Sequence, residues 1–258
     1  MKIKLLIGCT VVLLGGCSAF NPLPAVTPAQ LNTPTETAIE LMSLPKPKGK
    51  IPVSVYSFRD QTGQYKPQAG VSSFSTAVTQ RATSILIQAL SDSDWFSPVE
   101  REGLQNIITE RKIINKSYAI NAVNGVRKKL PTLKTASIIL EGGIIGYDTN
   151  IRAGGAGMEY FGIGAAELFR EDQISVYLRA VDVRTGRILL SVSTNKRVLS
   201  QEMSAGLFRY VSYKKLAEAE IGYSTNEPMQ QCVTQAIEKA LTSLILKGID
   251  KGVWHSKT

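Results

Sequence analysis

The clearest chemical signal is a cysteine near the start of the chain, Cys17, which follows the small-residue run 14–16 (Leu-Gly-Gly). A thiol is the nucleophile needed to take up a diacylglycerol group, and small residues before it let a signal peptidase reach the backbone. Two lysines and the apolar run 5–14 precede this motif, and the run is about half the ~20 residues of a membrane-spanning helix. The pattern predicts a signal peptide over 1–16 and a covalent lipid on Cys17.

The predicted lipid would attach the mature chain to a membrane. Ser18 stands where an aspartate usually keeps such proteins in the inner membrane, which favours the outer membrane. Several acyl chains on one cysteine hold firmly, whereas one chain holds weakly. Of the other two cysteines, Cys9 leaves with the signal peptide. Cys232 then has no partner for an internal disulfide, and we expect it to be a small core residue.

The residue types that most enzymatic chemistry needs are missing. His255 is the only histidine, four residues from the C-terminus, which argues against a Ser-His-Asp triad or a multi-histidine metal site. The sequence has no paired-cysteine zinc spacing and no phosphate-binding loop, and Gly162 and Gly164 lack the third small residue of a dinucleotide motif. We therefore expect neither an enzyme nor a cofactor other than the covalent lipid.

The chain is basic, with 30 Lys and Arg residues against 21 Asp and Glu residues. Removal of the two signal-peptide lysines leaves a net charge of +7. The basic residues form no cluster interleaved with aromatic residues, so nucleic acid is not expected as a partner. In an exported protein, this charge favours anionic headgroups, lipopolysaccharide or acidic partners.

The chain after the signal peptide is predicted to form an extended arm and then an α/β layer. Six prolines spread through 18–49 favour an extended tether or an arm laid over a neighbour. Strands are predicted over 51–58, 95–100 and 137–140, and helices over 74–92, 101–116 and 130–136. Ser73 or Ser75 is expected to cap the first of these helices. The alternation of strands and helices indicates an α/β class.

Residues 141–200 have a different character, because they are rich in glycine and then alternate in polarity. The alternating runs 173–183 and 187–195 predict two strands joined by a glycine-containing turn. Their alternation is imperfect and, taken alone, favours soluble hairpins over membrane strands. The C-terminal part predicts a helix with Asn226 at its N-cap, Pro228 in its first turn, and a broad apolar face typical of core packing.

Several runs, in the same order and over almost the whole mature chain, resemble the CsgG family of curli production assembly/transport components. The matching runs are 53–56 (VSVY), 62–67 (TGQYKP), 74–78 (FSTAV), 103–106 (GLQN), 110–114 (ERKII), 144–147 (IIGY), 160–165 (YFGIGA), 222–228 (GYSTNEP) and 248–254 (GIDKGVW). No single run is diagnostic, but together they are specific.

The resemblance implies an α/β periplasmic domain, similar to an anticodon-binding domain, over 50–146 and 211–258. The signal peptide over 1–16 and the lipidated arm over 17–49 would precede it. The segment 147–210 would form two β-hairpins that add four strands to a shared transmembrane β-barrel. About nine copies would then close a barrel of about 36 strands, the largest size known.

The resemblance also indicates where the two hairpins should lie. The first is expected within 147–182, with its tip near 158–164, and the second within 186–210, with its tip near 201–206. The aromatic side chains expected at the membrane interfaces are those of Tyr160, Phe161, Phe208 and Tyr210.

In this family, the loop between the first strand and the first helix narrows the pore with a Tyr, an Asn and a Phe from each subunit. Phe74 matches the Phe, Ser73 stands at the Asn position, and Gln68 stands at the Tyr position of a loop that is one residue longer. The loss of the Tyr would make the upper constriction more polar. The alternative for Phe74 is a core residue at the N-terminus of the helix.

The function implied by the resemblance is a homo-oligomeric, lipid-anchored channel in the outer membrane. Unfolded curli subunits, which form amyloid outside the cell, would pass through it without nucleotide hydrolysis. The implied partners are other copies of the chain, these subunits, the periplasmic adaptor CsgE, the accessory factor CsgF and outer-membrane lipid. The alternative is an outer-membrane lipoprotein adaptor that forms no pore and binds an envelope enzyme.

Overall fold

The structure, a computed structural model, describes residues 31, 33–64, 78–120, 129–154, 167–204, 207–211 and 227–257. Side chains are described for all of these except 119–120, 151–154, 167–170, 199–204, 207–211 and 227–228. Residues 34–258 form one compact unit. Its elements are α2 (Glu36–Met42), β1 (Ile51–Asp60), α3 (Ala82–Asp92), β2 (Phe96–Val99), α4 (Leu104–Ile120), β3 (Ile138–Gly154), β4 (Glu167–Asp182), β5 (Ile188–Ser204), β6 (Leu207–Val211) and α5 (Glu227–Asp250).

The strands form one six-stranded sheet in the order β2-β1-β3-β4-β5-β6. β1 runs parallel to both of its neighbours, and each later pair is antiparallel. The predicted α/β layer is therefore confirmed as a mixed sheet with helices. β3 passes through residue 147 without a break, so the expected hairpin segment continues strands of the α/β sheet.

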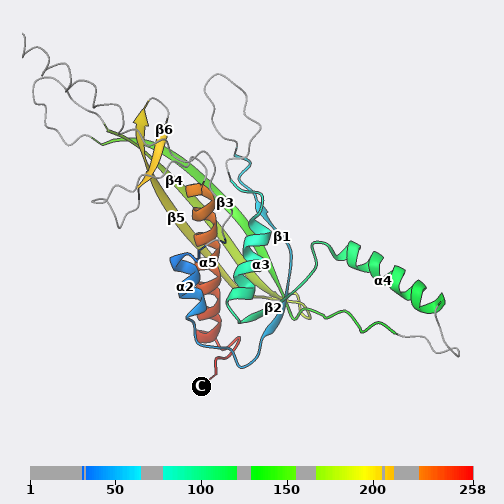
Figure 1. The fold of residues 1–258 in the computed structure, drawn as a ribbon. Helices are drawn as coiled ribbons and strands as arrows, with labels where there is room; N and C mark the ends of the chain where they lie inside the picture. Colours follow the sequence, from blue (N-terminus) through cyan, green and yellow to red (C-terminus); the bar gives the residue numbers. More distant parts are fainter. Residues whose placement is uncertain are drawn as a thin grey trace, which may run out of the picture. The chain divides into compact units, whose positions relative to one another are not determined.

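The helices α2, α3 and α5 gather on one face of the sheet (Figure 1). α5 packs against β4 and β5, α3 packs against β1 and β2, and α2 packs against both of these helices. The predicted apolar face of α5 forms the centre of this core, where Val233, Ile237, Leu241 and Leu244 are fully buried. Each large apolar side chain buried here contributes about 1.5–3 kcal/mol to folding.

The alternation predicted for β4 and β5 is confirmed by burial. Ile174, Val176 and Leu178 are fully buried against the helices, whereas Ser175 and Tyr177 between them face the other side and are half-buried. An antiparallel sheet with one covered face has this pattern. The same face of the sheet is therefore apolar along β4 from Ile174 to Ala180.

The helix predicted over 74–92 begins later than expected, at Ala82. Its N-cap is Arg81, with no side-chain cap, so the predicted capping by Ser73 or Ser75 is wrong. A contact with the sheet fixes this end of the helix. The Thr83 hydroxyl accepts a hydrogen bond from the backbone N–H of Phe58 (2.9 Å) and donates one to the Phe58 carbonyl (3.0 Å).

The helix predicted over 130–136 is absent, because this segment is extended. Its carbonyl groups bond to side chains and not to the amides of a helical turn. The guanidinium of Arg111 donates to the Pro131 carbonyl (2.5 Å), and that of Arg101 donates to the Lys134 carbonyl (2.8 Å). Both arginines flank or belong to α4, so α4 holds the segment that returns from it.

The start of the compact unit is fixed to α5 by one carboxylate. Thr35 caps α2 by accepting from the Ala38 N–H (3.0 Å), and its hydroxyl donates to Oε2 of Glu238. The Thr37 hydroxyl donates to the same oxygen (2.5 Å). Burial raises the pKa of Glu238, an effect that these two hydrogen bonds oppose.

The end of α5 is closed by Trp254, whose ring stacks edge-on against Phe96 with centroids 5.8 Å apart. The indole N–H donates to the Ile245 carbonyl (2.9 Å). The ring covers Gly248 so closely that a Cβ atom there would lie 2.1 Å from it. A side chain at this position would therefore displace the indole from β2.

We predict that Gly248→Ala destabilises the protein by about 1–3 kcal/mol, the usual cost of overpacking a dense core. Gly49→Ala is the matched control, because nothing lies within 4 Å of a Cβ atom at that position. Urea unfolding of the full chain in detergent, followed by tryptophan fluorescence, measures the difference. Equal midpoints for the two variants would contradict the close packing of Trp254 on Gly248.

We also predict that the loss of stability in Thr37→Val depends on pH. Because the pKa of Glu238 is raised in the fold, the folded protein binds a proton more readily than the unfolded chain. The contribution of Glu238 to folding stability therefore rises as pH falls through its raised pKa. It levels off below the ordinary glutamate pKa of about 4.3. Thr37→Val should cost about 1.5–3 kcal/mol near neutral pH, where it strips a donor from a buried carboxylate.

Near pH ~4, close to the ordinary glutamate pKa, the cost of Thr37→Val should shrink because the carboxyl group is largely protonated. Thr37→Ser, which keeps the hydroxyl, should have a stability close to that of the parent protein at both pH values. Thermal unfolding at the two pH values gives the comparison. A cost that does not change with pH would show that the hydroxyl does not stabilise the charged form of Glu238.

Candidate functional site

The two expected hairpins are present as paired strands of the sheet. β3 and β4 pair from Ile138 opposite Asp182 to Gly154 opposite Glu167, with one irregularity between Ile144 and Gly146. β5 pairs with β4 along almost its full length and with β6 at its far end. In the second hairpin β5 ends at Ser204 and β6 begins at Leu207, and residues 205–206 of the tip predicted over 201–206 lie outside the described residues. The first predicted tip, 158–164, lies outside the described residues.

A buried polar cluster lies on β3 and β4 at the level of Asp172. Asp172 is 1% exposed and shares its face of β4 with the apolar residues that contact the helices. Its Oδ1 accepts from the Tyr147 hydroxyl (3.1 Å) and the Thr149 hydroxyl (2.7 Å), both on β3. Buried hydrogen bonds to a carboxylate are strong and directional, so they fix the β3–β4 register at this level.

Sequence analysis missed this cluster, although a signal for it exists. Asp172 stands two residues before Ile174, and therefore at a position of β4 that should be buried and apolar. A carboxylate on a buried face requires hydrogen-bond donors from neighbouring strands. The alternation of β4 could therefore have marked Asp172 as a special residue.

Cys232 lies on α5 at the level of the same cluster. It is 1% exposed and free, as predicted. Its thiol donates to the Lys196 carbonyl over 3.7 Å. Burial raises the pKa of Cys232 to about 12, so the thiol stays protonated at neutral pH and is a poor nucleophile.

The loop with the predicted constriction residues leaves β1 and returns to α3 at one carboxylate. Asp60 Oδ1 accepts from the Thr62 N–H (2.8 Å) and hydroxyl (2.7 Å) on the outgoing side. Its Oδ2 accepts from the Gln80 amide (3.4 Å) on the returning side. Asp60 pairs with Ile144 of β3, so the two ends of the loop are held beside the first hairpin.

Most of the predicted site residues lie outside the described residues. They are Cys17, Gln68, Ser73, Phe74, Tyr160 and Phe161. The backbones of Phe208 and Tyr210 lie in β6, opposite Glu202 and Ser200, but their side chains are outside the described set. Because α3 begins at Ala82, Phe74 precedes this helix by eight positions, which counts against the alternative that it is a core residue of the first helical turn.

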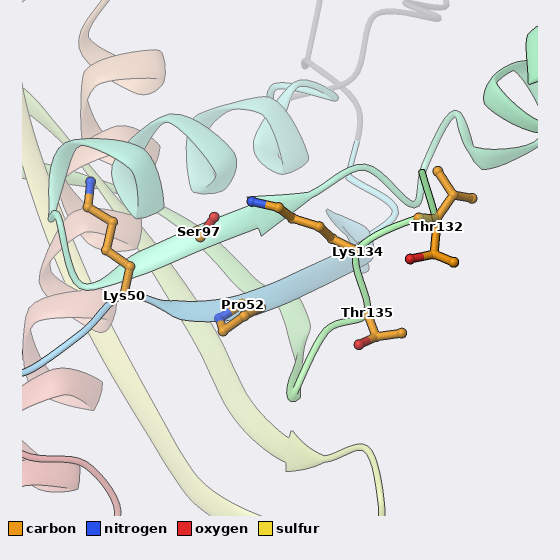
Figure 2. Close-up of a pocket in the computed structure, with 7 residues that line it drawn as sticks. Lys50, Pro52, Ser97, Thr132, Lys134 and Thr135 are labelled. Atoms are coloured by element: carbon orange, nitrogen blue, oxygen red, sulfur yellow. The ribbon is translucent and has the colours of Figure 1, made fainter. Parts of the chain in front are cut away.

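A groove of about 610 Å³ opens near the end of the sheet where β3 begins, opposite to the hairpin tips (Figure 2). Its lining residues are Lys50, Pro52, Ser97, Thr132, Leu133, Lys134 and Thr135. Near it, Lys50 and Lys46 both bond to Asp94, over 2.8 Å and 3.0 Å. These lysines, Lys50 first, lower the pKa of Asp94 to about 2. Sequence analysis did not find the groove, because its residues come from three separate segments.

The described residues offer no metal centre, since no group of three or more His, Cys, Asp or Glu side chains among them could hold an ion. His255 is exposed. In the same part of the chain, no helix combines the length and the apolar character needed to cross a membrane. The features of the described residues that remain as candidate sites are the paired strands, the loop held by Asp60 and the groove.

Two solved structures show a distant likeness to this chain. A PelC dodecamer from Paraburkholderia phytofirmans is 15% identical, with a TM-score of 0.32, and the match covers 78% of this chain and 91% of that chain. Protein XCC0632 from Xanthomonas campestris is 13% identical, with a TM-score of 0.37, and the match covers 87% of this chain and 97% of that one. At these scores, neither structure supports an inference about this chain.

Comparison with sequences is much stronger. The family model for the curli production assembly/transport component CsgG matches residues 34–258. The CsgG proteins of Citrobacter koseri and of Escherichia coli K12 are 48% and 47% identical over 253 residues, which cover 97% of this chain and 90% of each relative. The resemblance found in the sequence is therefore confirmed, and the chain belongs to the CsgG family of curli production assembly/transport components.

Proposed function

We propose that this chain is a subunit of an outer-membrane channel that secretes unfolded curli subunits. The relatives are named as components of curli production, assembly and transport, which supports a role in curli secretion and not an enzymatic one. The observation that carries the channel proposal is the pair of hairpins that continue the α/β sheet. They supply four adjacent strands from one chain, β3 to β6.

The lengths of these strands suit two tasks at once. β3, β4 and β5 have 16 or 17 residues each, or about 50–55 Å at the usual rise per residue. A transmembrane β-strand needs about 9–11 residues. One end of each long strand can therefore build the helix-covered core while the other end crosses the membrane.

A closed barrel requires several copies, because four strands cannot enclose a pore. About nine copies would give about 36 strands. The lipid on Cys17 would tether each copy to the outer membrane through the arm over 17–49, leaving the α/β domain in the periplasm. The Thr35 and Thr37 bonds to Glu238 would then attach the middle of that arm to α5, the helix at the centre of the core.

Transport through such a channel would use no nucleotide. The sequence holds no phosphate-binding loop, and direction would come from capture by partners and from folding of the subunits outside the cell. The proposed partners are CsgE on the periplasmic side, the accessory factor CsgF, and the exported subunits. Nucleic acid is not among them.

Planar-bilayer recording on the purified, detergent-extracted protein tests the channel. We expect a large, stable conductance, together with closed rings in electron micrographs of the same preparation. A preparation of folded protein that gives neither rings nor a large conductance would contradict the pore. It would favour the alternative, a lipoprotein adaptor whose α/β domain binds an envelope enzyme.

Phe74→Ala tests the proposed constriction. Removing one aromatic ring from every subunit should widen the narrowest point, so single-channel conductance should rise, and export of curli subunits should change with it. Ser75→Ala is a neighbouring control that should leave both quantities at the parent value. If conductance and export are both unchanged in Phe74→Ala, Phe74 does not line the pore.

A further inference from the structure

The groove in Figure 2 lies on the face of the sheet opposite α3. Pro52 of β1 pairs with Ser97 of β2, so the two side chains share a face. Their neighbours Val53 and Phe96 are buried on the side of the core. The extended segment 132–135 crosses in front of the open face and forms the opposite wall.

This segment is held at its ends and free in its middle. The Pro131 and Lys134 carbonyls accept bonds from arginines near α4, and the Ser137 N–H donates to the Pro52 carbonyl (2.8 Å). Within the part of the chain that the structure describes, the backbone N–H groups of 132–135 make no hydrogen bond. They form a short extended edge that another extended chain can pair with.

The groove carries positive charge. Lys134 has no acidic partner among the described residues, and Figure 2 shows it reaching over β2 toward Ser97. Lys50 and Lys46 share one carboxylate, Asp94, so that trio keeps one net positive charge. Lys46, Lys50, Asp94 and Lys134 together carry a net charge of +2. The hydroxyls of Ser97, Thr132 and Thr135 add neutral donors.

We propose that this groove binds an extended acidic peptide segment of a partner protein, which adds as a strand along 132–135. The free amides match the carbonyl groups of an extended chain, and the lysines match its Asp or Glu side chains. Pro52 and Leu133, which is 39% exposed, offer an apolar surface to the side chains between the acidic ones. A compact anion would use the charges but leave these amides and this surface unused.

The position of the groove favours a peptide over a lipid headgroup. It lies beside the first residue of β3, because the segment 132–135 leads directly into that strand at Ile138. The far end of β3, Gly154, is about 50 Å away along the strand. This step rests on the proposed function: if the far ends of the hairpins cross the membrane, the groove opens well away from it.

Fluorescence anisotropy with a labelled peptide of alternating Glu and Val residues tests the groove on the full-length protein in detergent. We expect saturable binding that weakens with salt and falls about tenfold or more in Lys134→Glu, a loss of about 1.4 kcal/mol or more. Lys116→Glu is the matched control, because Lys116 is exposed on α4 outside the groove. It should bind like the parent. Backbone N-methylation of the peptide should also weaken binding, since strand addition needs main-chain hydrogen bonds.

Several results would overturn the proposal. The first is no binding to the parent protein, and the second is equal loss in Lys134→Glu and Lys116→Glu. The third is equal affinity for a peptide with Lys in place of Glu, or full competition by phosphatidylglycerol vesicles. Loss of rings in Lys134→Glu without any peptide binding would assign the groove to a neighbouring copy and would also overturn it. Conductance recorded on the same preparation keeps failure of the channel separate from failure of the groove.

Discussion

The register between β3 and β4 is the constraint on which the rest of the structure depends. A slip of one residue would turn every side chain to the opposite face, so the apolar row on β4 would leave the helices. Two features prevent this slip. Asp172 bonds to two hydroxyls of β3, and Gly142 lies so close to β4 that a Cβ atom would be 2.0 Å from the Tyr177 carbonyl. This pairing sets the positions of the core, of the hairpins and of the segment 132–135.

The same strands meet two different environments along their length. Near α3 and α5 the covered face is apolar, and burial of residues such as Val176 and Leu178 stabilises the fold. At the level of Asp172 the covered face also carries a hydrogen-bonded carboxylate, beside the buried side chain of Val198 on β5. The buried carboxylate is stabilised there by the hydroxyl donors of Tyr147 and Thr149 on the neighbouring strand. Apolar packing and a hydrogen-bonded carboxylate therefore share one face of the sheet at this level.

Local periodicity predicted the features that depend on local spacing. The alternation of β4, the apolar face of α5 and the burial of Cys232 follow from repeats of two or of three to four residues. The start of α3 and the segment 130–136 were predicted wrongly, because remote contacts decide them. Thr83 is bonded to β1, and the carbonyls of the segment are taken by arginines of another element. The groove and the Asp60 contacts likewise join residues too far apart in sequence for any local pattern to show.

The charges of the groove suit a partner that must also leave. Solvent-exposed charges increase the association rate and the selectivity for a partner more than they increase the binding affinity. Lys134 is exposed, and the pair of lysines at Asp94 is about half exposed, so salt screens all of these charges. Main-chain pairing along only four residues adds little affinity of its own, because few side chains are buried with it. A short basic edge on a rigid sheet therefore favours fast, reversible capture of an acidic chain, whereas a deep apolar pocket at this place would hold its occupant and slow its release.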